Sequence, residues 1–210
     1  MLQQLFFLFV VRPLVLVVLG LNIRHRERIP TKGPAIVVSN HNSHLDTLVL
    51  MTLLPWSLLK LTRPVAAQDY FFRNNLLKWF ALTIMRIVPL ERHIADRSQD
   101  PLAGCSEALK HEEILILFPE GSRGDPEQLG TFKTGIAHLV KRHPDVPITP
   151  IYLHGLGKAL PRGEGLLVPF FCDVFVGEPL LWTGDKAGFM TVLETAIKAL
   201  AEEGHLPAWE

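Results

Sequence analysis

Two short polar segments of this 210-residue chain carry the side chains best suited to chemistry. The first reads NHNSHLD over residues 40–46 and places His41 five positions before Asp46. A turn that leads into a helix can bring a carboxylate of the first helical turn back against an imidazole, where it fixes the tautomer and stabilises the protonated ring. The other ring nitrogen can then take a proton from a hydroxyl, so this segment predicts a general base.

A general base needs a group to activate, and the sequence has no serine or cysteine in a nucleophile-elbow motif. We therefore expect the attacking hydroxyl to belong to a substrate. Two alternatives stay open at this point. The imidazole and the carboxylate could serve only to order the start of a helix, or His41, His44 and Asp46 could be zinc ligands in a metal-dependent hydrolase.

The second segment reads FPEGSRG over residues 118–124. Gly121 and Gly124 allow the backbone to approach an anion closely. Ser122 offers a hydroxyl, and Arg123 offers a planar guanidinium that suits a phosphate. The segment therefore predicts an anion-binding loop, with a polar turn and an exposed arginine as the simpler alternative.

Glu120 is the unexpected member of this segment, because a carboxylate beside a phosphate would repel it. We expect Glu120 either to accept a hydrogen bond from a substrate hydroxyl or to order the loop. Lys133 follows shortly afterwards in the sequence FKTG, close to the start of a predicted helix, and is a further candidate for contact with an anion.

The elements that must position these segments alternate along the chain. Short apolar, β-branched runs predict strands at residues 35–40, 65–67, 87–90, 114–118, 148–153 and 172–176. Helical spacing and capping signals predict helices at residues 43–54, 70–85, 101–110, 135–142 and 185–203. This alternation predicts an α/β fold with a mostly parallel central sheet flanked by helices. Both polar segments directly follow a strand, where ligands gather in such sheets.

The first part of the chain has a different character. Residues 1–23 are nearly all apolar, Arg12-Pro13 interrupts them, and three arginines at 24, 26 and 28 follow. We expect residues 1–28 to form an apolar helical membrane-associating segment, monotopic or re-entrant, whose basic flank meets headgroups on the cytoplasmic face. Residues 29–210 would form the α/β domain. The alternative is a broken amphipathic helix packed on the domain's own core.

Composition excludes several classes of protein. The chain is 48% hydrophobic, which is enough to form a core and excludes disorder. Its formal net charge of zero gives no field for a polyanion, so we expect no nucleic-acid partner. The two cysteines, Cys105 and Cys172, are too few for a disulfide framework and fit a reducing compartment.

Together the two polar segments resemble the motifs of the glycerolipid acyltransferase family, the type that includes 1-acylglycerol-3-phosphate acyltransferases. The family pattern N-H-x-S-x-x-D is matched by Asn40, His41, Ser43 and Asp46. Its F-P-E-G-[ST]-R block is matched without a gap by residues 118–123. IVPLER at residues 87–92 resembles the family's arginine motif, and VPITPIYL at residues 146–153 resembles its apolar fourth block. The resemblance covers roughly residues 30–180.

The resemblance implies transfer of a fatty acyl group from an acyl-CoA or acyl-carrier-protein thioester to the free hydroxyl of a lysolipid, by default 1-acylglycerol-3-phosphate. His41 would be the general base and Asp46 would orient it. Backbone amides around Gly121 would stabilise the oxyanion of the tetrahedral step. Arg92 and Arg123 would bind the phosphate of the acceptor.

The resemblance further implies that Glu120 positions the acceptor and that Ser122 belongs to the same substrate-binding loop. No metal or redox cofactor is expected, because a thioester is already activated, and the membrane surface is expected as a partner. The sequence departs from the family pattern at Arg86, where a glycine is common, and within VAAQDYFF at residues 65–72, where a common lysine is replaced. Another lysolipid acceptor and a non-catalytic lipid-binding module therefore stay open as alternatives.

Overall fold

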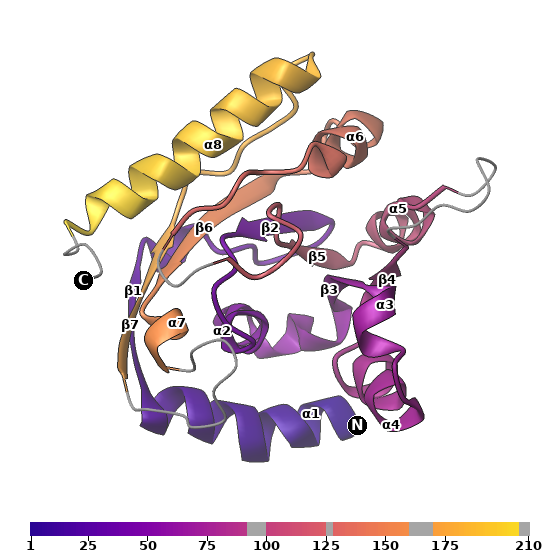
Figure 1. Ribbon diagram of the computed structural model, residues 1–210, viewed down its shortest axis with the longest axis vertical. Helices are drawn as coiled ribbons and strands as arrows, with labels where there is room; N and C mark the ends of the chain where they lie inside the picture. Colours follow the sequence, from indigo (N-terminus) through magenta and orange to yellow (C-terminus); the bar gives the residue numbers. More distant parts are fainter. Residues whose placement is uncertain (92–99, 125–127, 160–169, 206–210) are drawn as a thin grey trace.

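A seven-stranded sheet forms the centre of the computed structural model, which describes residues 1–91, 100–124, 128–159 and 170–205 (Figure 1). The strands, in their order across the sheet, are β1 (Leu19–Arg24), β7 (Phe170–Val176), β6 (Ile148–His154), β2 (Ala35–Ser39), β5 (Ile114–Leu117), β3 (Thr62–Ala67) and β4 (Val88–Leu90). The five strands from β6 to β4 are parallel, whereas β7 pairs antiparallel with β6 and parallel with β1. The expected α/β fold with a mostly parallel sheet is confirmed.

Helices cover both faces of the sheet (Figure 1). One face carries α5 (Ala103–Lys110), α6 (Gly135–Arg142) and α8 (Lys186–Glu203). The other carries the N-terminal helix, made of α1 (Leu2–Phe6), η1 (Phe7–Val11) and η2 (Leu14–Val18), together with α2 (Leu45–Leu53), η4 (Trp56–Leu61), η5 (Phe80–Ile84) and α7 (Leu156–Ala159). Strand residues alternate between the two cores: Val37 packs on one face, and Ile36 and Val38 on the other. This is the period of two that a sheet buried on both faces requires.

The helix predicted over residues 70–85 is broken in the structure. It consists of α3 (Gln68–Phe71), α4 (Asn75–Trp79) and η5. Asn74 ends the continuity because its side chain caps α4, accepting a hydrogen bond of 2.7 Å from the amide of Leu77. The strand predicted at residues 65–67 begins earlier, at Thr62, while the helix predicted from Ser43 begins at Leu45.

The N-terminal segment packs against the α/β domain and adds a strand to its sheet. Residues 19–24 form the edge strand β1, in which Leu19 pairs with Phe170 and Arg24 with Phe175. Phe7, Val11 and Val15 are fully buried against the sheet, so the N-terminal helix contributes one face to the core. For this buried face of the helix, the alternative prediction of an amphipathic helix packed on the domain's own core agrees with the structure.

The expected interruption at Arg12-Pro13 is also absent, because residues 2–18 are helical throughout. Proline lacks an amide hydrogen and collides with the carbonyl one turn earlier in an α-helix. The helix accommodates it by widening to π-type turns, η1 before and η2 after the dipeptide.

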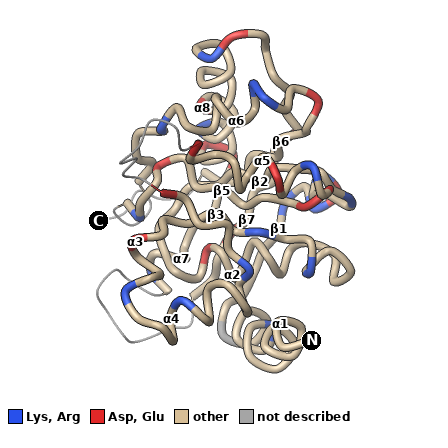
Figure 2. The backbone as a smooth tube through the Cα atoms, turned by 90° about the vertical axis from the view of Figure 1, so that its right-hand side faces the viewer, with Lys and Arg blue, Asp and Glu red and all other residues tan. Residues whose placement is uncertain are grey.

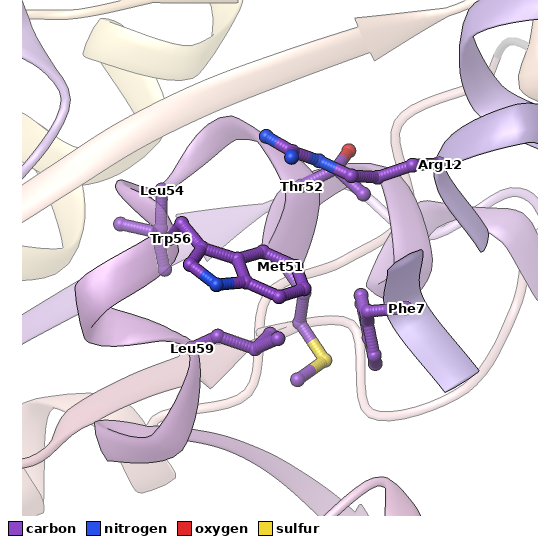
Figure 3. A pocket seen from close by; sticks show the side chains of 7 residues that line it. All are labelled: Phe7, Arg12, Met51, Thr52, Leu54, Trp56 and Leu59. Atoms are coloured by element: carbon purple, nitrogen blue, oxygen red, sulfur yellow. The ribbon is translucent and has the colours of Figure 1, made fainter. Parts of the chain in front are cut away.

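The N-terminal helix sits on α2 and η4 with little space between them (Figure 3). The guanidinium of Arg12 lies over the ring of Trp56, 4.9 Å from its centroid, and Phe7 and Met51 close the space below it. The cavity that remains is about 10 Å³, at the lower limit for holding a single water. The contact of the N-terminal helix with α2 and η4 is therefore closely packed. No helix among the described residues has the length and apolarity needed to span a bilayer.

The basic flank lies away from the apolar helix, contrary to expectation. β1 carries the chain six residues further, to the level of α8 (Figure 1). There His25 contacts Glu203 at 2.9 Å and Arg28 forms an ion pair of 2.8 Å with Glu178. Six residues of extended backbone separate the basic flank from the helix by about 20 Å.

Candidate active site

The two polar segments meet at one edge of the sheet, as predicted. β2 and β5 are parallel neighbours, with Val38 opposite Leu117. NHNSHLD therefore begins two residues beyond Val38, and FPEGSRG begins one residue beyond Leu117. The carboxyl ends of the two strands bring both segments to the same place.

The predicted pairing of His41 with Asp46 is present. Nδ1 of His41 lies 2.9 Å from Oδ2 of Asp46. The same Oδ2 accepts hydrogen bonds from the amides of Asn42 at 2.7 Å and Ser43 at 2.8 Å. Asp46 stands in the first turn of α2, so the helix start and the imidazole share one carboxylate oxygen.

Asp46 is completely buried, whereas the side chain of His41 is 18% exposed. Burial raises the pKa of Asp46, and the hydrogen bonds from His41, Ser43 and Asn42 oppose that rise. The aspartate is thus shielded from solvent behind a histidine that solvent or substrate can reach. A buried carboxylate behind an accessible imidazole is the arrangement in which a carboxylate orients a general base.

Asn40 anchors the segment, a role that the sequence reading did not assign. Its side-chain amide donates to the carbonyl of Leu153 and its Oδ1 accepts from the amide of the same residue, both at 2.8 Å. Leu153 belongs to β6, the other neighbour of β2. A buried asparagine directly after an apolar strand was the available signal, since such a group must find partners on a neighbouring strand.

The second segment surrounds His41. Oε1 of Glu120 accepts a hydrogen bond from the amide of His41 at 3.3 Å, and the amide of Gly124 donates to the carbonyl of His41 at 3.0 Å. The ring of Phe118 stacks on the imidazole, with centroids 4.0 Å apart and planes at 18°. Glu120 is only 5% exposed, and burial raises its pKa. Of the two roles considered for Glu120, these contacts match the ordering of the loop.

Gly121 forms part of a turn in the second segment. Its φ is +72°, in the left-handed region that favours glycine, and its amide donates to the carbonyl of Phe118 at 3.0 Å. This amide is therefore engaged in the turn. A Cβ at Gly121 would lie 2.8 Å from Nζ of Lys133, so the absence of a side chain makes room for that ammonium group.

The cationic groups of the second segment stand at the site. Arg123 is partly buried, and Ser122 is exposed. Burial lowers the pKa of His44, and the nearby charges of Arg123 and His41 lower it further. Arg123 and His41 are therefore both within electrostatic reach of His44. Arg92, the other predicted phosphate ligand, lies outside the described residues.

The zinc alternative is not supported by the placement of the side chains. Nε2 of His44 lies 3.3 Å from the hydroxyl of Tyr70, and the two rings are tilted neighbours with centroids 5.9 Å apart. Within the described ranges, no three side chains of His, Cys, Asp or Glu form a group that could hold a metal ion. The structure pairs His41 and Asp46 with each other and leaves His44 with an aromatic partner.

Arg86, the departure from the family pattern, has a φ of +54°. This is backbone that glycine adopts without strain, which accounts for the glycine common at this place. The arginine side chain contacts Glu113, with 3.8 Å between Nη2 and Oε1, and Glu113 also accepts a hydrogen bond of 2.8 Å from Nε of Arg63. Glu113 directly precedes β5, so this cluster lies at the opposite edge of the sheet from His41.

Comparison with known proteins agrees with this geometry. The sequence model of the acyltransferase family matches residues 20–154. The chloroplastic 1-acyl-sn-glycerol-3-phosphate acyltransferase LPAT1 of Arabidopsis thaliana is 35% identical over 169 residues, which are 80% of this chain and 45% of that protein. The human 1-acyl-sn-glycerol-3-phosphate acyltransferase alpha is 27% identical over 161 residues, 75% of this chain and 54% of that protein. The chain thus spans about half the length of the curated relatives it matches.

The fold has a counterpart among solved structures. The crystal structure of the 1-acyl-sn-glycerophosphate acyltransferase PlsC from Thermotoga maritima superposes with a TM-score of 0.77 at 20% identity, covering 99% of this chain and 80% of that one. At 20% identity the comparison shows that the two proteins share a fold. The match to the family, by contrast, runs from β1 to β6 and includes both polar segments that meet around His41. The chain therefore belongs to the acyltransferase family.

Proposed function

We propose that this chain transfers a fatty acyl group from an acyl thioester, carried by coenzyme A or by acyl-carrier protein, to the free hydroxyl of 1-acylglycerol-3-phosphate, giving phosphatidate. The observation that carries the proposal is the contact of 2.9 Å between His41 and the buried Asp46, at the strand ends where Arg123 also stands. Relatives that are named for this activity support the choice of acceptor.

The reaction follows from the orientation of the imidazole. Nδ1 faces Asp46, so Nε2 accepts the proton of the acceptor hydroxyl as its oxygen attacks the thioester carbonyl. The new C–O bond forms a tetrahedral oxyanion, which collapses with cleavage of the C–S bond. The imidazolium returns its proton to the departing thiolate. Asp46 stabilises the imidazolium between these two steps.

The acceptor's phosphate is assigned to the cationic side of the site. Arg123 can offer a bidentate pair of hydrogen bonds, and the ammonium group of Lys133 lies next to Gly121 in the same loop. Arg92 is assigned to the same phosphate from its sequence motif. Another lysolipid with an anionic headgroup is the alternative acceptor, since these side chains would bind the negative charge of the headgroup and would not contact the acyl chain.

The membrane surface is proposed as the place of reaction, on its cytoplasmic face. Exposed large apolar side chains cluster at the end of the molecule that carries α1 and α4 (Figures 1 and 2). They are Leu2, Leu5, Leu8, Phe9, Val10, Leu16 and Val17 of the N-terminal helix, Leu76, Trp79 and Leu82 of α4 and η5, and Phe170 and Phe171 of β7. The N-terminal helix is nearly free of charge along its length (Figure 2). We call this set the apolar end; an exposed set of this size is typical of a membrane-binding or protein-binding surface.

The two helical parts of the apolar end are joined. The rings of Phe6 in α1 and Phe80 in η5 meet edge to face, with centroids 5.4 Å apart. Phe171 contacts the backbone of β1, because a Cβ at Gly20 would lie 2.6 Å from its ring. The apolar end is therefore a fixed surface of the fold, suited to peripheral or monotopic binding.

The decisive experiment is the variant His41→Ala in the full chain. We expect kcat for acyl transfer from acyl-CoA or acyl-carrier protein to 1-acylglycerol-3-phosphate to fall by about 10²- to 10⁴-fold, the range for a lost general base. His44→Ala is the control, and it should retain most of the activity because His44 contacts Tyr70. Transfer at the wild-type rate by folded His41→Ala would refute the proposed mechanism, and a wild-type chain that consumes no acyl thioester would refute the function.

A further inference from the structure

The FPEGSRG loop contacts His41 in three separate ways. The amide of His41 donates to Glu120, its carbonyl accepts from Gly124, and its ring stacks on Phe118. The main-chain donor and the main-chain acceptor of His41 are thus both held by a loop that is some eighty residues away in the sequence. The two hydrogen bonds hold the peptide units on either side of the His41 Cα, and these units set the direction in which its side chain leaves the backbone.

Neither oxygen of Glu120 is presented to a substrate. Oε1 is engaged by the amide of His41, and Oε2 has essentially no exposed surface. Two glycines create the space for this carboxyl group. A Cβ at Gly124 would lie 3.2 Å from Oε2, and a Cβ at Gly130 would lie 3.0 Å from Oε2 and 3.3 Å from Cδ. The side chain therefore points into the protein, behind the catalytic histidine.

We propose that Glu120 is a positioning residue: it fixes the main chain of His41, and through it the direction of the imidazole, and it does not bind the acceptor. This inference rests on the proposed function and deepens it. Accepting an N–H requires an oxygen lone pair and no negative charge. Burial, which raises the pKa of this carboxyl group, also favours a neutral form. The amide oxygen of glutamine can therefore replace it.

The test compares four variants of the full chain with 1-acylglycerol-3-phosphate and acyl-CoA. Glu120→Ala removes the acceptor of the His41 amide, and Gly130→Ala adds a methyl group 3.0 Å from Oε2, so the carboxyl group must shift by a few tenths of an ångström. Glu120→Ala should lower kcat by about 10- to 100-fold, the cost of a misplaced catalytic group, and Gly130→Ala should lower it by a smaller factor because the shift is smaller. Both should leave the KM of the acceptor within about threefold of wild type. Glu120→Gln should retain kcat within about threefold, because it keeps the hydrogen bond.

Gly135→Ala is the matched control. It makes the same substitution five residues further on, where an added Cβ has no atom within 4 Å, and it should behave as wild type. Loss of activity in Glu120→Gln as severe as in Glu120→Ala would overturn the proposal, because the charge would then be needed. A rise in acceptor KM with unchanged kcat in Glu120→Ala or Gly130→Ala would overturn it as well, since it would indicate a substrate contact.

A measurement without turnover separates this inference from the proposed function. The imidazole resonances of His41, assigned by their absence in His41→Ala, should change in Gly130→Ala and Glu120→Ala and stay at wild-type positions in Glu120→Gln and Gly135→Ala. Unchanged His41 resonances in folded Gly130→Ala would refute the positioning role even if the wild type is active. Should Glu120→Ala fail to fold, Gly130→Ala and Glu120→Gln still decide the question.

Discussion

Oδ2 of Asp46 lies 2.9 Å from Nδ1 of His41, and the aspartate has no solvent-exposed surface. The same oxygen also accepts hydrogen bonds from the amides of Asn42 and Ser43, so one buried atom holds both the imidazole of His41 and the start of α2. Accepting the two backbone amides requires only an oxygen lone pair, whereas stabilising a protonated imidazole requires a negative charge. A neutral substitute at this position therefore separates the two roles.

Asp46→Asn should lower kcat by about 10²- to 10⁴-fold while the chain stays folded. The amide oxygen of asparagine can still accept the two backbone hydrogens, but a neutral group cannot stabilise the imidazolium. Steady-state kinetics together with near-ultraviolet circular dichroism would check this. Activity close to wild type would mean that the aspartate only orders the helix start.

The stability of Asp46→Asn relative to wild type should improve as the pH rises from about 4 to 7. Burial raises the pKa of Asp46, so the folded chain holds this proton more tightly than the unfolded chain. The resulting stability is fully present below the unfolded pKa and is lost as the pH rises through the folded pKa. Asparagine does not titrate, so the free energy of unfolding of the variant has no pH-dependent contribution from position 46. Urea unfolding across this range measures the difference, and a relative stability that declines with pH would contradict the sign.

Arg123→Ala should raise the KM of the acceptor by about 10- to 100-fold, which corresponds to the loss of a charge-assisted hydrogen bond of about 1.5–3 kcal/mol. The KM of the thioester should change little. Arg123→Lys should recover only part of the effect, because an ammonium group cannot form a bidentate fork. Initial rates with each substrate varied in turn provide the measurement. If neither KM moves, the phosphate is bound elsewhere.

Arg86→Gly should be more stable than Arg86→Ala by about 1 kcal/mol. Both variants lose the contact with Glu113, and they differ only in how they tolerate a φ of +54°. Alanine retains the left-handed strain and glycine removes it, at a smaller cost in unfolded-state entropy. Thermal or urea unfolding of the pair would show the difference. Equal stabilities would mean that the backbone relaxes when the arginine is removed.

Phe9→Glu and Val17→Glu should each weaken binding to phospholipid vesicles without unfolding the chain. Their side chains are 70% and 83% exposed, and burying a large apolar side chain in a bilayer contributes about 1.5–3 kcal/mol. Val192→Glu on α8, at the other end of the molecule, is the control for the added charge (Figure 1). Vesicle sedimentation measures the partition. Equal loss in all three variants would refute the apolar end as the membrane surface.

High salt should weaken that binding only in part, because Lys78 of α4 stands among the apolar side chains whereas Arg28 is paired with Glu178. A chain shortened to begin at Glu27 would be no test of anchoring. It would lack β1 and the buried residues Phe7, Val11 and Val15, and should therefore fail to fold. Circular dichroism of the shortened chain checks this expectation.

The sequence predicted the local features well. Apolar runs identified the strands that are buried on both faces, and the positions of His41 and Asp46 at one strand end predicted their contact. β1 was missed because LGLNIR continues an apolar helix with no turn signal before it, and its partner is β7, near the other end of the chain. The break at Asn74 was missed because apolar spacing continues across it. The burial of Glu120 could not be predicted, since it depends on space left by Gly124 and Gly130 in the folded loop.

The pairing of β1 with β7 joins residues that are 151 positions apart, as in the contact between Asn22 and Asp173. A ribosome that adds about 5–20 residues per second needs about 8–30 s to synthesise that interval. During this time the apolar N-terminal helix and β1 already exist, but β7, the strand with which β1 pairs, does not. The nascent chain therefore exposes this apolar segment long before its partner strand is made, and a nearby bilayer can hold the segment until β7 is synthesised and pairs with β1.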